Sequence, residues 1–224
     1  MFGKRPEICF IWIPKSAGNS IYEWLHVEVG MRKLPNPKEF RKFRNSGSVT
    51  FGHAHYLSLI DLGFVSAAYH ARAFKFAVVR DPYDRVVSLY NYMSGRGVYA
   101  HDFDRFLDDV RLRRPPIGAY NYKWISPAAP QVQWLLDGNG EFVTNMLFGH
   151  DQLAALASEV RRRLGRPLKS SIGHLNASIG AVSAASSVLS NPARLEIINE
   201  VYAADFELLG YPMRRSHDAA DDGA

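Results

Sequence analysis

The sequence contains a single cysteine and no long apolar run, and each of these absences excludes a class of protein. One cysteine cannot form an internal disulfide, and Cys9 lies within an apolar stretch, so we expect a buried and inert thiol. The longest apolar run near the start, Ile8–Ile13, is much shorter than the ~20 residues that cross a membrane. Pro14 and Lys15 interrupt it, so it does not resemble a secretory signal, and we expect a cytoplasmic protein.

Length and charge set broad limits. The 224 residues suffice for one domain, and 47% hydrophobic with 22% charged residues is ordinary for a globular protein. We predict one domain over residues 1–213, an insert or lid near the functional site over residues 94–130, and a disordered tail over residues 214–224. The formal net charge of +5 favours anionic partners without selecting among nucleotides, acidic glycans and nucleic acid.

Strand-like and helix-like segments alternate along the chain. Residues 7–13 are almost continuously apolar, as in a parallel strand covered on both faces, and residues 19–29 have helical spacing. A second strand and helix are predicted at residues 74–79 and 83–93, with Pro82 suited to the first helical turn. Weaker signals predict a strand at 49–51 and helices at 152–164 and from Asn191 to Gly210. The fold class is therefore α/β, a single P-loop-like domain in which helices flank a mainly parallel central sheet.

Small residues and one lysine join the first strand to the first helix, in the order Pro14-Lys15-Ser16-Ala17-Gly18-Asn19-Ser20. Small residues permit close approach of a ligand, and backbone N–H groups at a helix start face an anion. Lys15 adds a positive charge and Ser20 a hydroxyl donor. The lysine precedes the glycine, so the segment differs from the Gly-x-x-x-x-Gly-Lys-Ser/Thr loop of nucleoside triphosphatases. The alternative interpretation is a tight structural turn with an exposed lysine.

A second polar group of residues follows the second strand, in Arg80-Asp81-Pro82-Tyr83-Asp84-Arg85-Val86-Val87-Ser88. Arg80 stands where the strand ends, which is where ligands bind in open α/β sheets, and Ser88 follows two helical turns later. A guanidinium group and a hydroxyl suit a terminal phosphate. The alternative is a capping salt bridge between Arg80 and Asp84. Arg85 is interpreted as a structural ion-pair partner.

Together, in this order, the two motifs resemble the sulfotransferases that use 3′-phosphoadenosine 5′-phosphosulfate (PAPS), particularly the carbohydrate branch related to heparan sulfate 2-O-sulfotransferases. That family binds the 5′-phosphosulfate with a Pro-Lys-x-x-Gly-x-Ser type loop and the 3′-phosphate with an Arg-Asp-Pro-x-x-Arg-x-x-Ser-x-Tyr segment. The resemblance implies that residues 15–20 bind the 5′ end of PAPS. It also implies that Arg80 and Ser88 bind the 3′-phosphate, which distinguishes PAPS from ATP.

Further similarities to the same family are weaker. Gly52-His53 resembles the segment that carries the catalytic base in several carbohydrate sulfotransferases. The stretch His174-Leu175-Asn176-Ala177-Ser178 resembles a loop near the adenosine of the donor, which makes Asn176 a candidate donor-binding residue. Asn19 stands where the family often has threonine, and Phe51 stands where the heparan branch has a second histidine. The second departure argues against a uronic-acid acceptor.

The chemistry of sulfonate transfer assigns further roles. A sugar hydroxyl needs a base with a pKa near neutral to remove its proton, so His53 is the candidate base and His55 is the fallback. If both histidines lie on one strand, they share a face of it. The alternative is that His53 only makes structural hydrogen bonds at the end of a strand. Lys15 would stabilise the departing phosphate. The sulfonate carries a single negative charge, so we expect no metal requirement.

The predicted partner is a hydroxyl-bearing acceptor, most simply a carbohydrate or glycoconjugate, and not a nucleic acid. Two other classes stay open at this point. A kinase-like phosphotransferase would bind ATP in preference to PAPS. A non-catalytic glycan or nucleic-acid binder would use the basic charge and aromatics such as Trp124 and Trp134. Packing in the core or lid is the simpler explanation of those aromatics, and no recognised nucleic-acid motif accompanies them.

Overall fold

The structure is a computed structural model that describes residues 6–99, 102–117, 125–173 and 189–215. Its sheet has the strand order β2-β3-β1-β4-β5, and every pairing is parallel. The strands are β1 (Ile8–Ile11), β2 (Arg32–Lys33), β3 (Val49–Thr50), β4 (Phe74–Val79) and β5 (Met146–Gly149). The α/β class with a parallel central sheet is therefore confirmed, and the strand predicted at residues 74–79 matches β4.

The described residues fall into two compact units. The first contains the sheet and comprises the described residues up to Val79, Ile125, and those from Trp134 to 173. Its helices are α1 (Gly18–Val29), α2 (Pro37–Phe40), α3 (Tyr56–Asp61), α4 (Ala67–Arg72) and α7 (Leu153–Leu164). The second comprises the described residues from Arg80 to 117, Ser126–Gln133, and those from Leu189 onward. Its helices are α5 (Pro82–Ser94), α6 (Phe103–Arg111), α9 (Pro192–Val201) and α10 (Ala203–Leu209). A short 3-10 helix, η2, spans Gln131–Trp134.

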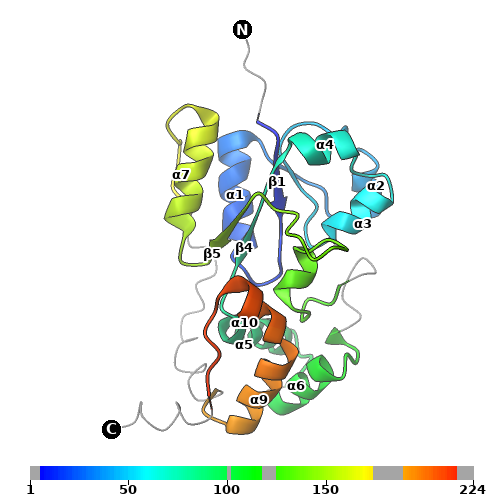
Figure 1. Cartoon of the computed structure of the whole chain (residues 1–224), viewed down its shortest axis with the longest axis vertical. Helices are drawn as coiled ribbons and strands as arrows, with labels where there is room; N and C mark the ends of the chain where they lie inside the picture. The colour runs from blue at the N-terminus through cyan, green and yellow to red at the C-terminus, as the bar shows by residue number, and fades with distance from the viewer. Residues whose placement is uncertain (1–5, 100–101, 118–124, 174–188, 216–224) are drawn as a thin grey trace. The chain divides into compact units, whose positions relative to one another are not determined.

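Helices cover both faces of the sheet in the first unit (Figure 1). Alternate residues of β1 and β4, such as Phe10 and Phe76, pack in one core cluster with Leu25 of α1 and Leu156 of α7. Cys9 points to the other face. Its predicted burial is confirmed, and burial raises the pKa of its thiol to about 12, which disfavours the reactive thiolate.

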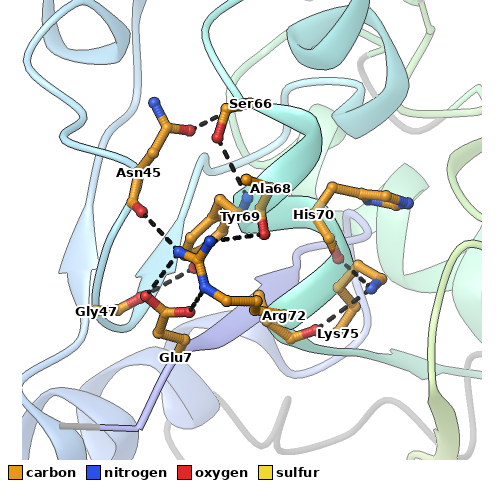
Figure 2. Close-up of polar contacts among 10 residues, drawn as sticks. Glu7, Asn45, Gly47, Ser66, Ala68, Tyr69, His70, Arg72 and Lys75 are labelled. Carbon is orange, nitrogen blue, oxygen red and sulfur yellow. Dashed lines mark hydrogen bonds and ion pairs between the residues drawn. The ribbon is translucent and has the colours of Figure 1, made fainter. Parts of the chain in front are cut away.

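A polar network fixes α4 at the amino ends of β1 and β4 (Figure 2). The Arg72 guanidinium donates to both carboxylate oxygens of Glu7, at 3.0 and 3.2 Å. Lys75 of β4 is buried, and its ammonium donates to the carbonyls of His70 and Ala73 at 2.7 and 3.3 Å. Burial lowers the pKa of Lys75. Structural contacts thus occupy the amino end of the sheet, while the candidate ligand-binding loops leave its carboxyl end.

The second unit has its own hydrophobic core. Phe106 and Leu107 of α6 are fully buried there with Ile198 of α9 and Tyr202. Residues 103–110 belong to the segment interpreted from sequence as an insert, and that reading missed α6. The signal was present, since Phe103, Phe106, Leu107 and Val110 recur at helical spacing.

The predicted C-terminal helix is interrupted once. Its start and end are confirmed: Asn191 caps α9 through its side chain, and Gly210 ends α10 in the left-handed conformation. Between them, Tyr202 separates α9 from α10, and its hydroxyl donates to the Ala128 carbonyl at 2.6 Å. The spacing of apolar residues cannot reveal this hydrogen bond, which lies at the point where the predicted helix is interrupted.

None of the helices in the described part of the chain has both the length and the apolar character needed to cross a membrane.

Candidate active site

The loop between β1 and α1 has the backbone of an anion cradle. Lys15 and Ala17 both adopt left-handed conformations, with φ of 69° and 58°, on either side of Ser16. Non-glycine residues avoid this region. A backbone in which left-handed and right-handed residues alternate turns its successive N–H groups toward one concave point, where an anion can bind. Helix α1 begins at Gly18, so the N–H groups of its first turn and its dipole add to the same positive field. Strain of this kind collects at functional sites, which favours a bound anion over a simple turn.

Side chains of the loop differ in exposure. Ser16 and Ser20 are buried, whereas Lys15 and Ala17 are partly exposed and Asn19 is exposed. The predicted residues therefore lie in one strand-to-helix turn, with the lysine at its surface.

Gly18 packs directly against Trp12, a contact that the sequence did not predict. A β-carbon at this position would lie 1.6 Å from Nε1 of Trp12 and 2.2 Å from two carbons of the same indole ring. The indole thus occupies the space that a side chain would need. Close packing of Trp12 therefore requires the glycine, and the expectation that Gly18 also permits close approach of a ligand stays a prediction.

His53 lies in the turn after β3 and is tied to the same tryptophan. Its Nδ1 lies 3.1 Å from the Trp12 carbonyl oxygen, and its ring packs edge-on against the indole with centroids 5.3 Å apart. A carbonyl only accepts hydrogen bonds, so Nδ1 must carry the proton. The lone pair of the neutral imidazole is therefore on Nε2, which makes that atom the one able to act as a base.

His55 has another role. It occupies the N-cap position of α3, and its Nδ1 lies 2.8 Å from the Ser58 hydroxyl. Because β3 ends at Thr50, neither histidine lies on a strand, and the conditional expectation that they share a strand face does not apply. The contact of His53 with Trp12, which directly follows β1, favours His53 over His55 as the base.

Arg80 follows directly after β4, as predicted. Its Nη2 lies 3.8 Å from the Asp84 carboxylate, so the alternative capping pair is present, but at a separation typical of a weak surface ion pair. Its Nε is buried and has no hydrogen-bond partner among the described residues. A buried donor without an acceptor fits a guanidinium that binds an anion. Ser88 lies on α5 and is partly buried.

Two residues that sequence reasoning missed hold the Arg80 backbone in place. The fully buried Gln131 accepts from the Arg80 N–H at 2.9 Å and donates to its carbonyl at 2.7 Å. Asp205 in turn accepts from the backbone N–H groups of Gln131 and Val132 at 2.8 and 3.0 Å. Burial raises the pKa of Asp205 in spite of the nearby Arg85 charge and these hydrogen bonds. No local pattern marks these contacts, since 51 residues separate Gln131 from Arg80.

Arg85 is buried and donates to backbone carbonyls, where the sequence predicted an ion pair. It is 1% exposed and donates to the carbonyls of Ala129 and Pro127 at 3.0 and 2.7 Å. Its guanidinium therefore fastens residues 127–129 to α5.

Two further expectations concern Asn176 and metal ions. Asn176, with the rest of the stretch 174–178, lies outside the described residues. Among the residues that the structure describes, no three His, Cys, Asp or Glu side chains are grouped as a metal site would require.

Comparison with known proteins now adds to this geometry. A model of the sulfotransferase family matches residues 1–212. The chain belongs to the sulfotransferase family. Membership supports sulfonate transfer as the activity and confirms the resemblance inferred from the two motifs.

Other comparisons add less to the sulfotransferase assignment. A crystal structure of a sulfotransferase from Alicyclobacillus acidocaldarius is similar, with 13% sequence identity and a TM-score of 0.49 over 89% of this chain and 96% of that one. No curated protein sequence matches the chain significantly.

Proposed function

We propose that the protein transfers a sulfonate group from PAPS to a hydroxyl of a carbohydrate or glycoconjugate acceptor. The observation that carries this proposal is the strained cradle formed by Lys15 and Ala17 at the start of α1. Because the chain belongs to a family that transfers sulfonate groups, the anion that this loop would bind is the phosphosulfate of the donor.

The donor contacts are assigned residue by residue. Residues Lys15 to Ser20 bind the 5′-phosphosulfate through backbone N–H groups, the ammonium and the hydroxyls. Arg80 and Ser88 bind the 3′-phosphate, for which the Nε of Arg80 is suited, since it is buried and has no hydrogen-bond partner in the described part of the chain. Asn176 is assigned to the adenosine side on the family resemblance alone.

In the proposed reaction, His53 Nε2 removes the proton from the acceptor hydroxyl. The hydroxyl oxygen forms a bond to sulfur, and the bond between sulfur and the 5′-phosphate oxygen breaks in line with the attack. Lys15 and the loop N–H groups stabilise the negative charge that grows on the departing phosphate. Adenosine 3′,5′-bisphosphate leaves, and the proton stays on His53 until solvent removes it. The transferred group has a single negative charge, so the proposal includes no metal ion.

Nucleotide selectivity tests the proposal. Ligand that binds only the folded state raises its stability by mass action, so adenosine 3′,5′-bisphosphate should raise the melting temperature well above the value with AMP. Arg80→Ala should remove most of that difference. In parallel, radiolabelled PAPS and ATP would be incubated with a panel of glycans, glycolipids and small hydroxylated metabolites. Equal thermal shifts with the two nucleotides would contradict the donor assignment, and transfer from ATP alone would indicate a phosphotransferase.

A further inference from the structure

The segment Ser126–Gln133 is held in the second unit by buried polar side chains from three places. Arg85 of α5 and Tyr202 donate to the carbonyls of residues 127–129, over distances between 2.6 and 3.0 Å. Asp205 of α10 accepts from two backbone N–H groups at the end of the segment, at 2.8 and 3.0 Å. All three side chains are buried, so water does not compete for these hydrogen bonds. The backbone of the segment is therefore fixed before any ligand binds.

This fixed segment presents one side-chain amide to the residue that follows β4. Strand β4 ends at Val79, and the Gln131 amide pairs with the next residue, Arg80, through both of its ends. Its Oε1 accepts from the Arg80 N–H at 2.9 Å, and its Nε2 donates to the Arg80 carbonyl at 2.7 Å. Gln131 thus supplies the two partners that a neighbouring strand would supply.

Asp205 fixes which way the amide of Gln131 points. The Nε2 of Gln131 lies 3.4 Å from Asp205 Oδ2, and that oxygen also accepts from the Gln131 backbone N–H. A carboxylate oxygen that accepts hydrogen bonds must face the NH₂ end of an amide. The other end, Oε1, is then the one that meets the Arg80 N–H.

The side chain of Arg80 is held only weakly by its own contacts. Its Nη2 lies 3.8 Å from the Asp84 carboxylate, and its Nε is buried without a hydrogen-bond partner among the described residues. A guanidinium binds phosphate through parallel N–H groups in one plane, so this contact demands an accurate position. Because a shift of the Arg80 backbone carries the guanidinium with it, the backbone decides where that plane lies.

We infer that Gln131 is a positioning residue for nucleotide selectivity, which holds the Arg80 backbone so that the guanidinium meets the 3′-phosphate, and that Asp205 holds Gln131 in the orientation this requires. The inference rests on the proposed function, since it takes Arg80 as the residue that binds the 3′-phosphate. Neither Gln131 nor Asp205 contacts the nucleotide in this arrangement. Helix α10 therefore acts on donor selectivity through Gln131 and Arg80 alone.

Selectivity for the 3′-phosphate is the measurement that separates positioning from a merely structural role. Calorimetry of the full chain gives the dissociation constants of adenosine 3′,5′-bisphosphate and AMP, and their ratio measures the selectivity. Gln131→Met keeps the length of the buried side chain but lacks the amide. We expect this variant to lower the selectivity about three- to tenfold and to change the affinity for AMP by less than about twofold. Asp205→Asn should lower the selectivity in the same direction.

A double variant tests whether Gln131 acts through Arg80. Arg80→Ala alone should remove most of the selectivity, and adding Gln131→Met to it should remove no more, because the two residues then belong to one pathway. Tyr202→Phe is the matched control, since it removes a hydrogen bond from the same segment at the Ala128 carbonyl. This control should lower the melting temperature but leave the selectivity of the parent chain.

The possible results divide clearly between the inference and the proposed function. Unchanged selectivity in Gln131→Met, a further loss when it is added to Arg80→Ala, or an equal loss in Tyr202→Phe would each overturn the inference. If Gln131→Met does not fold, Asp205→Asn is judged by the same three comparisons. A parent chain that binds the bisphosphate and AMP equally would contradict the proposed function itself, and the inference would fall with it.

Discussion

Replacing Gly18 with alanine separates two explanations for a glycine at the start of α1. The added methyl group would lie 1.6 Å from Trp12 Nε1, so the indole must move. Movement disturbs its stacking on Phe10 and Tyr22, which are both 5.9 Å away between ring centroids. Overpacking costs about 1–3 kcal/mol and each lost ring pair about 0.5–1.5 kcal/mol, while alanine regains about 0.5–1 kcal/mol of backbone entropy. We therefore expect Gly18→Ala to lower the free energy of unfolding by about 2 kcal/mol.

The double variant Gly18→Ala with Trp12→Leu measures the contact itself. Trp12→Leu alone should cost about 2–4 kcal/mol, because a large core side chain is truncated. If the methyl group and the indole compete for one space, the double variant should be at least about 1 kcal/mol more stable than the sum of the single effects. Urea denaturation of the four proteins gives this coupling energy, and calorimetry gives their affinity for adenosine 3′,5′-bisphosphate.

The two explanations predict different affinities. If the glycine exists for Trp12, the smaller Leu side chain should also recover the bisphosphate affinity lost in Gly18→Ala. Additive stabilities, combined with an affinity that stays low in the double variant, would refute the packing argument. Gly18 would then be required for close approach of the ligand.

Three further predictions address the base, the C-terminal half of α1 and the buried arginine. In single-turnover assays His53→Ala should slow sulfonate transfer about 10²–10⁴-fold without loss of bisphosphate affinity, whereas His55→Ala should have little effect. A slow His55→Ala variant beside a fully active His53→Ala variant would make His55 the base. Glu28→Gln should lower the free energy of unfolding by about 2–3 kcal/mol at pH 7, measured by urea denaturation, and by progressively less below pH ~4.5. The control Glu159→Gln breaks only surface ion pairs and should lower it by under about 1 kcal/mol. A loss of stability in Glu28→Gln that does not change with pH would contradict this prediction. Arg85→Met should lower the free energy of unfolding by about 3 kcal/mol but keep the preference for the bisphosphate over AMP, and a stable variant without that preference would mean that Arg85 binds phosphate.

The sign of the Glu28 prediction follows from its surroundings. Burial alone would raise the pKa of Glu28, but hydrogen bonds from Ser170, Lys169 and Arg166 outweigh it and lower the pKa. The Glu28 carboxylate accepts from the Lys169 and Ser170 N–H groups at 2.7 and 2.8 Å. A lowered pKa in the folded state stabilises the protein above the unfolded pKa, and that contribution is lost as the pH falls through the folded value.

Local patterns were sufficient to predict the two strand-loop-helix segments. The apolar run of β1, the complete β4 and the helical spacing of α1 and α7 could be read from the sequence, because burial on both faces of a sheet and on one face of a helix imposes those periods. The caps of α9 and α10 could be read as well, because Asn191 and Gly210 act on neighbouring backbone groups. The family resemblance likewise rested on two short motifs, and the match over residues 1–212 confirms it.

Contacts between distant segments had no such signature. The bond from His53 to the Trp12 carbonyl and the hydrogen bonds of Gln131 to the Arg80 backbone depend on where the fold brings remote residues together. The packing of Trp12 against Gly18 depends on how the loop between β1 and α1 turns. Sequence alone marked Lys15, His53 and Arg80 as candidates by residue type and place. Only the tertiary structure decided which nitrogen of His53 holds the lone pair and placed the Trp12 indole where a side chain at position 18 would lie, because a hydrogen-bond partner or a steric limit exists only once the chain is folded.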